Sequence, residues 1–287
     1  MGKADRNRSQ SARARIAAQQ EQQRKADARR RMIAFGGVGL AVIAVVVIIL
    51  VAVLLKKTPS QSGASGGTLP ASVQANLAVP AKTLASVGAG TAAPQALRRV
   101  SGPRLLSGSK PEMLYIGAEW CPYCAAERWS MAVALRRFGT FSPLRGIHSS
   151  ATDVFPNTAT LTFYRTTYSS KYLVFTPVEN QAVDRSTLQK PTSAQQALWS
   201  KYQPPGNGYP FIDIGNMFVS SATYSPQVLQ GLTWSQIASD LHNPASPVAQ
   251  GANGSANLFT AAICKMTGNQ PASVCTAAPI PALESKL

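Results

Sequence analysis

The sequence has few of the side chains from which metal centres are built. Its 287 residues include only two histidines and four cysteines, and 12 acidic residues stand against 28 lysines and arginines. A structural zinc ion needs four ligands, usually Cys or His. Cys121 and Cys124 have the close spacing of such ligands, but the other candidates form no second pair of this kind: Cys264, Cys275, His148 and His242. We therefore predict no metal ion and no other cofactor.

Positive charge is in excess, with a formal net charge of +16. Such an excess is one sign of nucleic-acid binding. However, ten of the basic residues lie in the first 31, and the rest are scattered without forming a basic stripe. We therefore expect no nucleic-acid partner. Residues 1–31 are predicted to form a cytoplasmic tail, either solvated or lying as a helix on anionic lipid.

Residues 32–55 form a long apolar run without a single charged side chain. As a helix this run would span about 36 Å, more than the roughly 30 Å of a bilayer core. The competing interpretation is a cleaved signal peptide, whose apolar region is normally only about 7–15 residues long. We predict an uncleaved transmembrane helix. Because most nearby basic residues precede it, the N-terminus is expected in the cytoplasm and the remaining chain outside.

The rest of the chain is expected to comprise a linker and one folded domain. Residues 56–96 are rich in Ser, Gly, Ala and Pro, which is typical of a flexible linker. The alternative for its second half is a short helix or docking segment, marked by Val73, Leu77, Val79 and Leu84. Residues 97–280 have the composition of a folded domain. Within it, residues 158–168 and 171–178 are predicted as two strands joined by a hairpin at Ser169–Ser170.

The most informative stretch is the Cys-Pro-Tyr-Cys motif that begins at Cys121. The apolar run 114–116 before it predicts a strand, and residues 125–135, which lack Gly and Pro, predict a helix. Cys121 would then lie at a helix N-terminus, where the backbone N–H groups favour an anion and lower a thiol pKa. Pro122 suits the first turn of a helix. We therefore predict Cys121 as the nucleophile and Cys124 as the thiol that resolves a mixed disulfide.

This motif resembles those of thioredoxin-like oxidoreductases. The Ala-Glu-Trp-Cys lead-in, residues 118–121, is similar to thioredoxin, and the Cys-Pro-Tyr-Cys core is the form common in glutaredoxins. Thioredoxins carry a buried Asp six residues before the first Cys, as a proton acceptor for the second, whereas this chain has Tyr115 there. The resemblance implies an α/β fold with a mixed sheet and helices on both faces.

The resemblance also implies a cis-proline ahead of a strand, facing the two cysteines. Tyr209–Pro210, which precedes the apolar residues 211–214, is the candidate. An ordinary trans proline at the start of a strand is the alternative. On this basis the substrate groove is predicted to contain Trp120, Pro122, Tyr123, Tyr209 and Pro210.

A more specific resemblance extends over about residues 97–276. Four segments together are similar to the actinobacterial and archaeal family catalogued as domain of unknown function 929: residues 119–129, 138–142, 209–216 and the region of Cys264 and Cys275. This resemblance supports the thioredoxin-like expectation but implies no substrate.

The resulting hypothesis is a membrane-anchored, extracytoplasmic thiol–disulfide oxidoreductase. Its substrates would be protein thiols and disulfides, its anchor would lie in the lipid bilayer, and an unidentified redox partner would restore the Cys121–Cys124 pair. The alternatives are a non-enzymatic protein that binds a soft metal such as Cu(I) through its thiolates, or a scaffold with a static Cys121–Cys124 disulfide.

Cys264 and Cys275 lie close together near the end of the chain. Disulfides persist outside the cytoplasm, so a structural bridge between these two cysteines is expected. The alternative is a second redox pair that exchanges electrons with Cys121 and Cys124.

Overall fold

Strand β3 (Lys110–Ala118) lies within the largest sheet and ends next to the Cys-Pro-Tyr-Cys motif. The computed structural model describes residues 66–92, 96–203 and 208–287. In the described chain, β3 is buried from Met113 onward because it is covered on both faces. Met113 and Tyr115 belong to one apolar cluster, whereas Leu114 and Ile116 belong to another. This alternation follows from the two-residue repeat of a strand.

The largest sheet is mixed, with the strand order β1-β10-β9-β3-β2 and with β8 also paired to β3. β8 runs parallel to β3, and β9 runs antiparallel to it. The other strands of this sheet are β1 (Leu97–Arg99), β2 (Leu106–Ser107), β8 (Val174–Gln181), β9 (Phe211–Ile214) and β10 (Phe218–Ser220). The described chain also has two small antiparallel sheets, which pair β4 (Gly139–Phe141) with β7 (Tyr168–Ser170) and β5 (Arg145–His148) with β6 (Ala159–Thr162).

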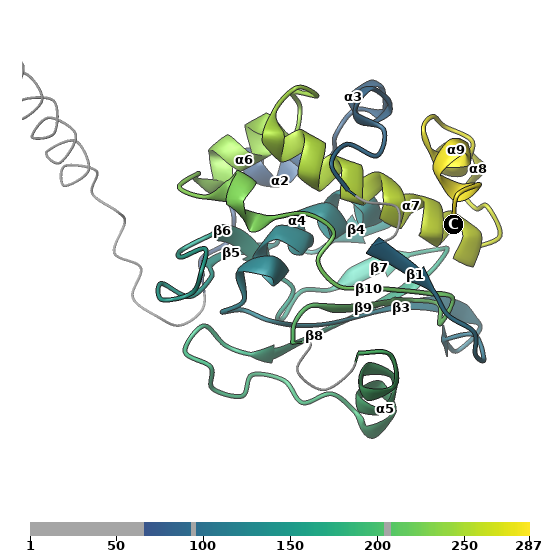
Figure 1. Ribbon diagram of the computed structural model, residues 1–287, viewed down its shortest axis with the longest axis horizontal. Coiled ribbons are helices and arrows are strands. Elements are labelled where there is room, and N and C mark those ends of the chain that lie inside the picture. Colours follow the sequence, from purple (N-terminus) through teal and green to yellow (C-terminus); the bar gives the residue numbers. More distant parts are fainter. Residues whose placement is uncertain (1–65, 93–95, 204–207) are drawn as a thin grey trace, which may run out of the picture. The chain divides into compact units, whose positions relative to one another are not determined.

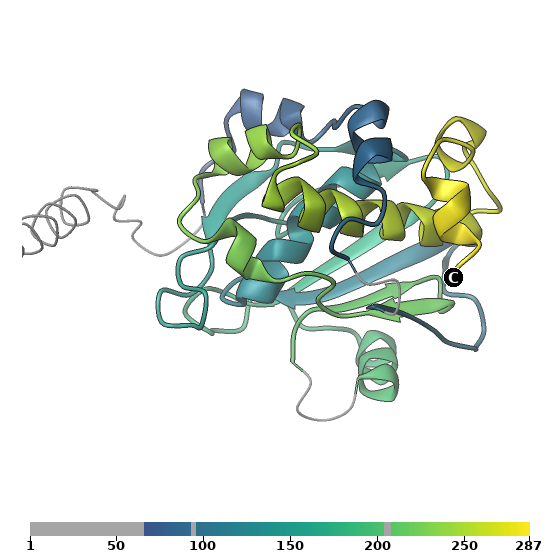
Figure 2. The same cartoon turned by 45° about the horizontal axis from the view of Figure 1, so that its top comes forward.

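Helices lie on both faces of the large sheet (Figure 1). One face is covered by α4 (Pro122–Arg136) and α7 (Gly254–Met266), which pack against each other. The opposite face carries α5 (Ser193–Tyr202), whose residues Leu198 and Trp199 contact the second apolar cluster. Figure 2 shows the same separation from a second direction. Shorter helical segments complete the fold: η2 (Pro226–Leu229), α6 (Trp234–Asp240), η3 (Ala249–Asn253), α8 (Ala272–Cys275) and α9 (Ile280–Glu284).

The predicted fold class, a thioredoxin-like sheet preceded by a transmembrane helix and a flexible linker, was wrong. Within the described ranges, no helix combines the length and the apolar character that crossing a bilayer requires. The segments predicted as a basic tail and a transmembrane helix, residues 1–31 and 32–55, lie outside the described residues. The described chain has a mixed α/β fold with a mixed sheet.

Residues 56–96, predicted as a flexible linker, form helices in the part that the structure describes. This part contains two helices, α2 (Ala71–Asn76) and α3 (Ala81–Val87), and joins the main apolar core. Asn257 on α7 holds the end of α3 through hydrogen bonds from Nδ2 to the carbonyl oxygens of Leu84 and Gly88, both at 2.8 Å. Val73, Leu77 and Leu84, which marked the alternative of a short helix or docking segment, are buried in this core.

Replacing Leu84 by Ala tests this packing. Leu84 is almost completely buried in the main core, so its truncation should cost about 2–5 kcal/mol of unfolding free energy. Leu106→Ala is the matched control, because Leu106 is half exposed and its loss should change stability by no more than about 0.5 kcal/mol. Urea unfolding measures both. Equal effects of the two substitutions would mean that residues 66–92 contribute little to the core.

Cys264 and Cys275 form a disulfide that ties the end of α7 to α8. Both cysteines are buried, and their sequence separation is 11. Closing a loop of this size stabilises a protein by roughly 3 kcal/mol in the chain-entropy model.

The double variant Cys264→Ser/Cys275→Ser should therefore melt at a lower temperature. It should retain thiol exchange at Cys121, because neither serine replaces a residue near that thiol. Calorimetry and a thiol-exchange assay measure the two effects. Loss of exchange with unchanged melting would instead favour a redox relay through Cys264 and Cys275.

Candidate active site around Cys121 and Cys124

Cys121 lies at the N-terminus of α4, in the position predicted from the sequence. It is the N-cap residue of the helix, and Pro122 is in the first helical turn. The Cys121 Sγ accepts a hydrogen bond from the backbone N–H of Cys124 at 3.3 Å. It also lies 3.6 Å from the backbone carbonyl oxygen of Tyr209, to which it donates. Both cysteines are free thiols.

The two thiols have different environments. Cys121 is 3% exposed and Cys124 is fully buried. The pKa of Cys121 is lowered, chiefly by a hydrogen bond from the Cys124 side chain, with further contributions from backbone N–H groups and from the charge of Arg128. Burial raises the pKa of Cys124, and an ionised Cys121 beside it raises that pKa further. The site therefore favours one thiolate at a time, at Cys121.

Aromatic side chains surround Cys121. The Trp120 and Tyr209 rings meet edge to face at 5.9 Å, and Tyr209 also contacts Trp199, with ring centroids 5.2 Å apart. On another side, Tyr123 meets the ring of Phe155 at 5.9 Å. The Tyr209–Pro210 peptide bond is cis. Of the predicted groove residues, Trp120 and Tyr209 pack against the two cysteines, whereas Pro122 and Tyr123 lie in the first turn of α4.

This surface includes exposed apolar side chains and one cation. Tyr123 is 37% exposed and Val154 is 69% exposed, which makes them two of the three exposed large apolar residues in the described ranges. The guanidinium of Arg185 lies over the Trp120 ring at 3.8 Å and 3.6 Å from the carboxylate of Asp153. An apolar surface with charged residues at its edge has the composition of a surface that binds a polypeptide.

A buried ion pair lies beneath the two cysteines. Arg128 on α4 donates to Glu179 on β8 through Nε at 2.8 Å and Nη2 at 2.7 Å, and both side chains are fully buried. Arg128 Nη2 also donates to the carbonyl oxygen of Ala118 at the end of β3. Glu119, whose pKa is raised by burial, accepts a hydrogen bond from Thr162 Oγ1 at 2.7 Å.

The sequence prediction did not include Arg128, Glu179, Phe155 or Arg185. Arg128 carried one usable signal, because it is a charged residue one helical turn after Cys124 in a helix that is mostly apolar. Nothing in the local sequence links Glu179 to it, since their separation is 51 residues.

The residues considered as further zinc ligands lie elsewhere. Cys264 and Cys275 are in the disulfide, the ring of His148 contacts that of Trp234 at 4.4 Å, and His242 lies 2.9 Å from the carbonyl oxygen of Asn76. In the described part of the chain, no three His, Cys, Asp or Glu side chains are grouped so that they could hold a metal ion.

One family model matches this chain. It is described as Domain of unknown function (DUF929), and it matches residues 96–265, more than half of the sequence. The chain belongs to this family. The DUF929 match includes both cysteines of the motif, the aromatic residues around them and the Arg128–Glu179 pair. No curated protein and no solved structure matches the chain.

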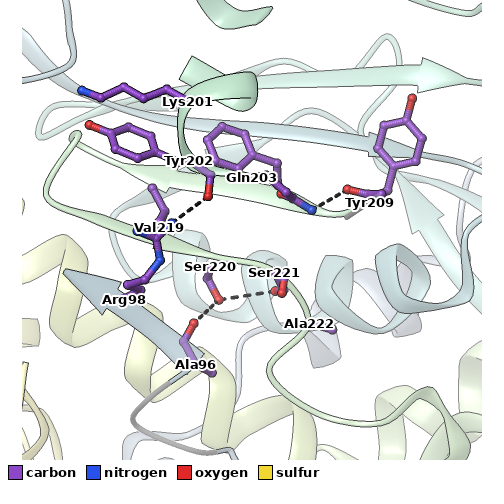
Figure 3. Close-up of a pocket in the computed structure, with 12 residues that line it drawn as sticks. Ala96, Arg98, Lys201, Tyr202, Gln203, Tyr209, Val219, Ser220, Ser221 and Ala222 are labelled. Atoms are coloured by element: carbon purple, nitrogen blue, oxygen red, sulfur yellow. Dashed lines mark hydrogen bonds between the residues drawn. The ribbon is translucent and has the colours of Figure 1, made fainter. Parts of the chain in front are cut away.

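A cavity of about 700 Å³ borders Tyr209 within the DUF929 region (Figure 3). It lies between the C-terminal end of α5 and strands β1 and β10. Arg98 donates to the carbonyl oxygen of Tyr202 at 2.7 Å, and Gln203 donates to that of Gly208 at 2.6 Å. These bonds hold the end of α5 against β1 and the segment that leads to Tyr209.

The effect of Cys124 on Cys121 can be measured by alkylation. The rate of Cys121 modification by iodoacetamide should rise with pH through a midpoint below the free-thiol value of about 8.5. Cys124→Ala should raise that midpoint, because it removes the side-chain hydrogen bond that most lowers the Cys121 pKa. Cys124→Ser, which keeps a donor, should raise it less. A wild-type midpoint at or above the free-thiol value would contradict the proposed activation of Cys121.

Proposed function

We propose that the protein is a thiol–disulfide oxidoreductase that acts on protein thiols and disulfides. The supporting observation is the position of the Cys121 Sγ at the N-terminus of α4, where it accepts a hydrogen bond from the Cys124 backbone N–H. The second thiol, that of Cys124, is fully buried. A thiol in this position at the helix N-terminus has a lowered pKa, so more of it is present as the nucleophilic thiolate. The second thiol is three residues away and can reach a disulfide formed at the first.

In the reducing direction, the Cys121 thiolate attacks one sulfur of a substrate disulfide. A new S–S bond forms between Cys121 and that sulfur, the substrate bond breaks, and the other sulfur leaves as a thiolate that takes up a proton. Cys124 then attacks the Cys121 sulfur and releases the second substrate thiol. The substrate gains two electrons, and the protein ends with a Cys121–Cys124 disulfide. The same steps in reverse oxidise a substrate dithiol.

A second redox partner must restore the pair after each turnover, because one Cys121–Cys124 pair carries only two electrons. The Cys264–Cys275 disulfide supports an extracytoplasmic location, since structural disulfides persist in oxidising compartments. Two exposed apolar side chains support a polypeptide substrate: Tyr123, two residues after Cys121, and Val154, next to the Phe155 whose ring Tyr123 contacts.

Trapping of mixed disulfides tests this proposal. Cys124→Ser removes the resolving thiol but leaves Cys121 at the helix N-terminus. This variant should accumulate covalent, reductant-sensitive adducts with other proteins, visible on non-reducing gels. Cys121→Ser should form none, because Cys124 is fully buried.

The same pair of variants separates the alternatives. Adducts from neither variant, or from Cys121→Ser alone, would overturn the assignment. A soft-metal site instead predicts weaker metal binding in both variants and adducts in neither.

A further inference from the structure

Two buried hydrogen-bond donors near Cys124 lack a partner. The Tyr115 hydroxyl and Arg128 Nη1 are both buried, and neither makes a well-aligned hydrogen bond with any described residue. Unpaired donors in a protein interior are costly and rare. Both residues interact electrostatically with Cys124, and the Cys124 side chain is the hydrogen-bonding group within reach of the Tyr115 phenol. These observations suggest that both donors are positioned to interact with an anion. The Cys124 thiolate is such an anion, and it is absent while Cys124 is protonated.

The sequence directs the phenol of Tyr115 toward the cysteines. Tyr115 and Gly117 lie on the same face of β3, because they are two residues apart in a strand. A Cβ atom at Gly117 would lie 1.9 Å from the Tyr115 hydroxyl oxygen. The phenol therefore occupies the space above Gly117, toward the end of β3 that leads to Cys121. Phe163 fixes the ring on another side through an edge contact at 5.6 Å.

Arg128 lies one helical turn after Cys124, on the same side of α4. Glu179 occupies one edge of its guanidinium, the edge formed by Nε and Nη2. Nη1 is therefore left without a partner at the other end of the group. The positive charge of Arg128 lowers the pKa of Cys124, although burial has the larger and opposite effect.

We propose that the Tyr115 hydroxyl donates a hydrogen bond to the Cys124 thiolate, in the field of the Arg128 guanidinium, during release of the mixed disulfide. This inference rests on the proposed function. The Cys124 sulfur attacks the Cys121 sulfur, the Cys121–Cys124 bond forms, and the bond to the substrate breaks. The substrate sulfur leaves with the electron pair and takes up a proton in place of the one that Cys124 lost. No further oxidant or reductant is needed.

Tyr115 acts as a donor rather than as a base. Burial raises the pKa of Tyr115 well above its ordinary value, so the phenol stays protonated. It thus stabilises the Cys124 thiolate without accepting its proton. The other titratable or charged groups that interact with Tyr115 or Cys124 come from several elements: Cys121 at the N-cap of α4, Arg128 on α4, Glu179 on β8 and Tyr209 before β9. Glu119 in turn interacts with Arg128 and Glu179.

Tyr115→Phe in the full chain, reacted with 5,5′-dithiobis(2-nitrobenzoate) in a stopped-flow instrument, tests the inference. Attack by Cys121 releases one thionitrobenzoate, and attack by Cys124 releases a second, so the two steps are measured separately. Loss of a hydrogen bond to a charged group should slow the second release about tenfold or more and raise its pH midpoint by about one unit. The first release should stay within about twofold of the wild-type rate.

Tyr168→Phe is the matched control. The Tyr168 hydroxyl is partly buried and donates to the carbonyl oxygen of Leu135, near the other end of α4. This variant should leave both releases unchanged and lower the melting temperature, because it removes a formed hydrogen bond. Tyr115→Phe should not lower the melting temperature, because its hydroxyl has no well-aligned bond in the reduced protein.

Each contrary outcome has a definite meaning. An unchanged second release in Tyr115→Phe, an equal slowing of both releases, or a failure of this variant to fold would overturn the inference. A wild-type protein that shows no first release would overturn the proposed function itself.

Discussion

The buried ion pair between Arg128 and Glu179 joins the three elements that carry the candidate site. Arg128 comes from α4, Glu179 comes from β8, and the carbonyl oxygen of Ala118 at the end of β3 accepts from the same guanidinium. Burying two charges is costly unless each is well hydrogen-bonded, and removing one partner typically destabilises a protein by about 3–5 kcal/mol. The pair therefore fixes the start of α4 relative to the sheet, and with it the position of both cysteines.

This arrangement gives two similar thiols different chemistry. Cys121 lies at the helix N-terminus, where N–H groups favour its thiolate, whereas Cys124 lies one turn deeper, where burial favours the thiol. Near them, the Trp120 and Tyr209 rings meet edge to face, and the Tyr123 ring is partly exposed. Below them lie Tyr115 and Arg128, which in the proposed mechanism stabilise a Cys124 thiolate through a hydrogen bond and a positive charge, respectively. The geometry is consistent with nucleophilic attack at one cysteine and resolution at the other.

Local sequence patterns predicted the strand and the helix that position Cys121 and Cys124. The features that these patterns did not predict depend on contacts between residues far apart in the sequence. The apolar run before Cys121 and the Gly-free, Pro-free run after it correctly predicted β3 and α4. The hairpin expected at Ser169–Ser170 was wrong, because β6 pairs with β5 and β8 joins β3 in parallel. Strand pairing depends on tertiary neighbours that a local pattern does not contain. The Arg128–Glu179 pair was missed for the same reason.

The reduction potential of the Cys121–Cys124 pair is the most direct test of the central claim. The fraction of disulfide can be measured by mass spectrometry after equilibration in dithiothreitol buffers of defined potential. A redox-active pair should have a potential above about −300 mV, in the range of thiol–disulfide oxidoreductases. A potential below about −300 mV, which is typical of structural disulfides, would contradict the account and identify the pair as a static bridge.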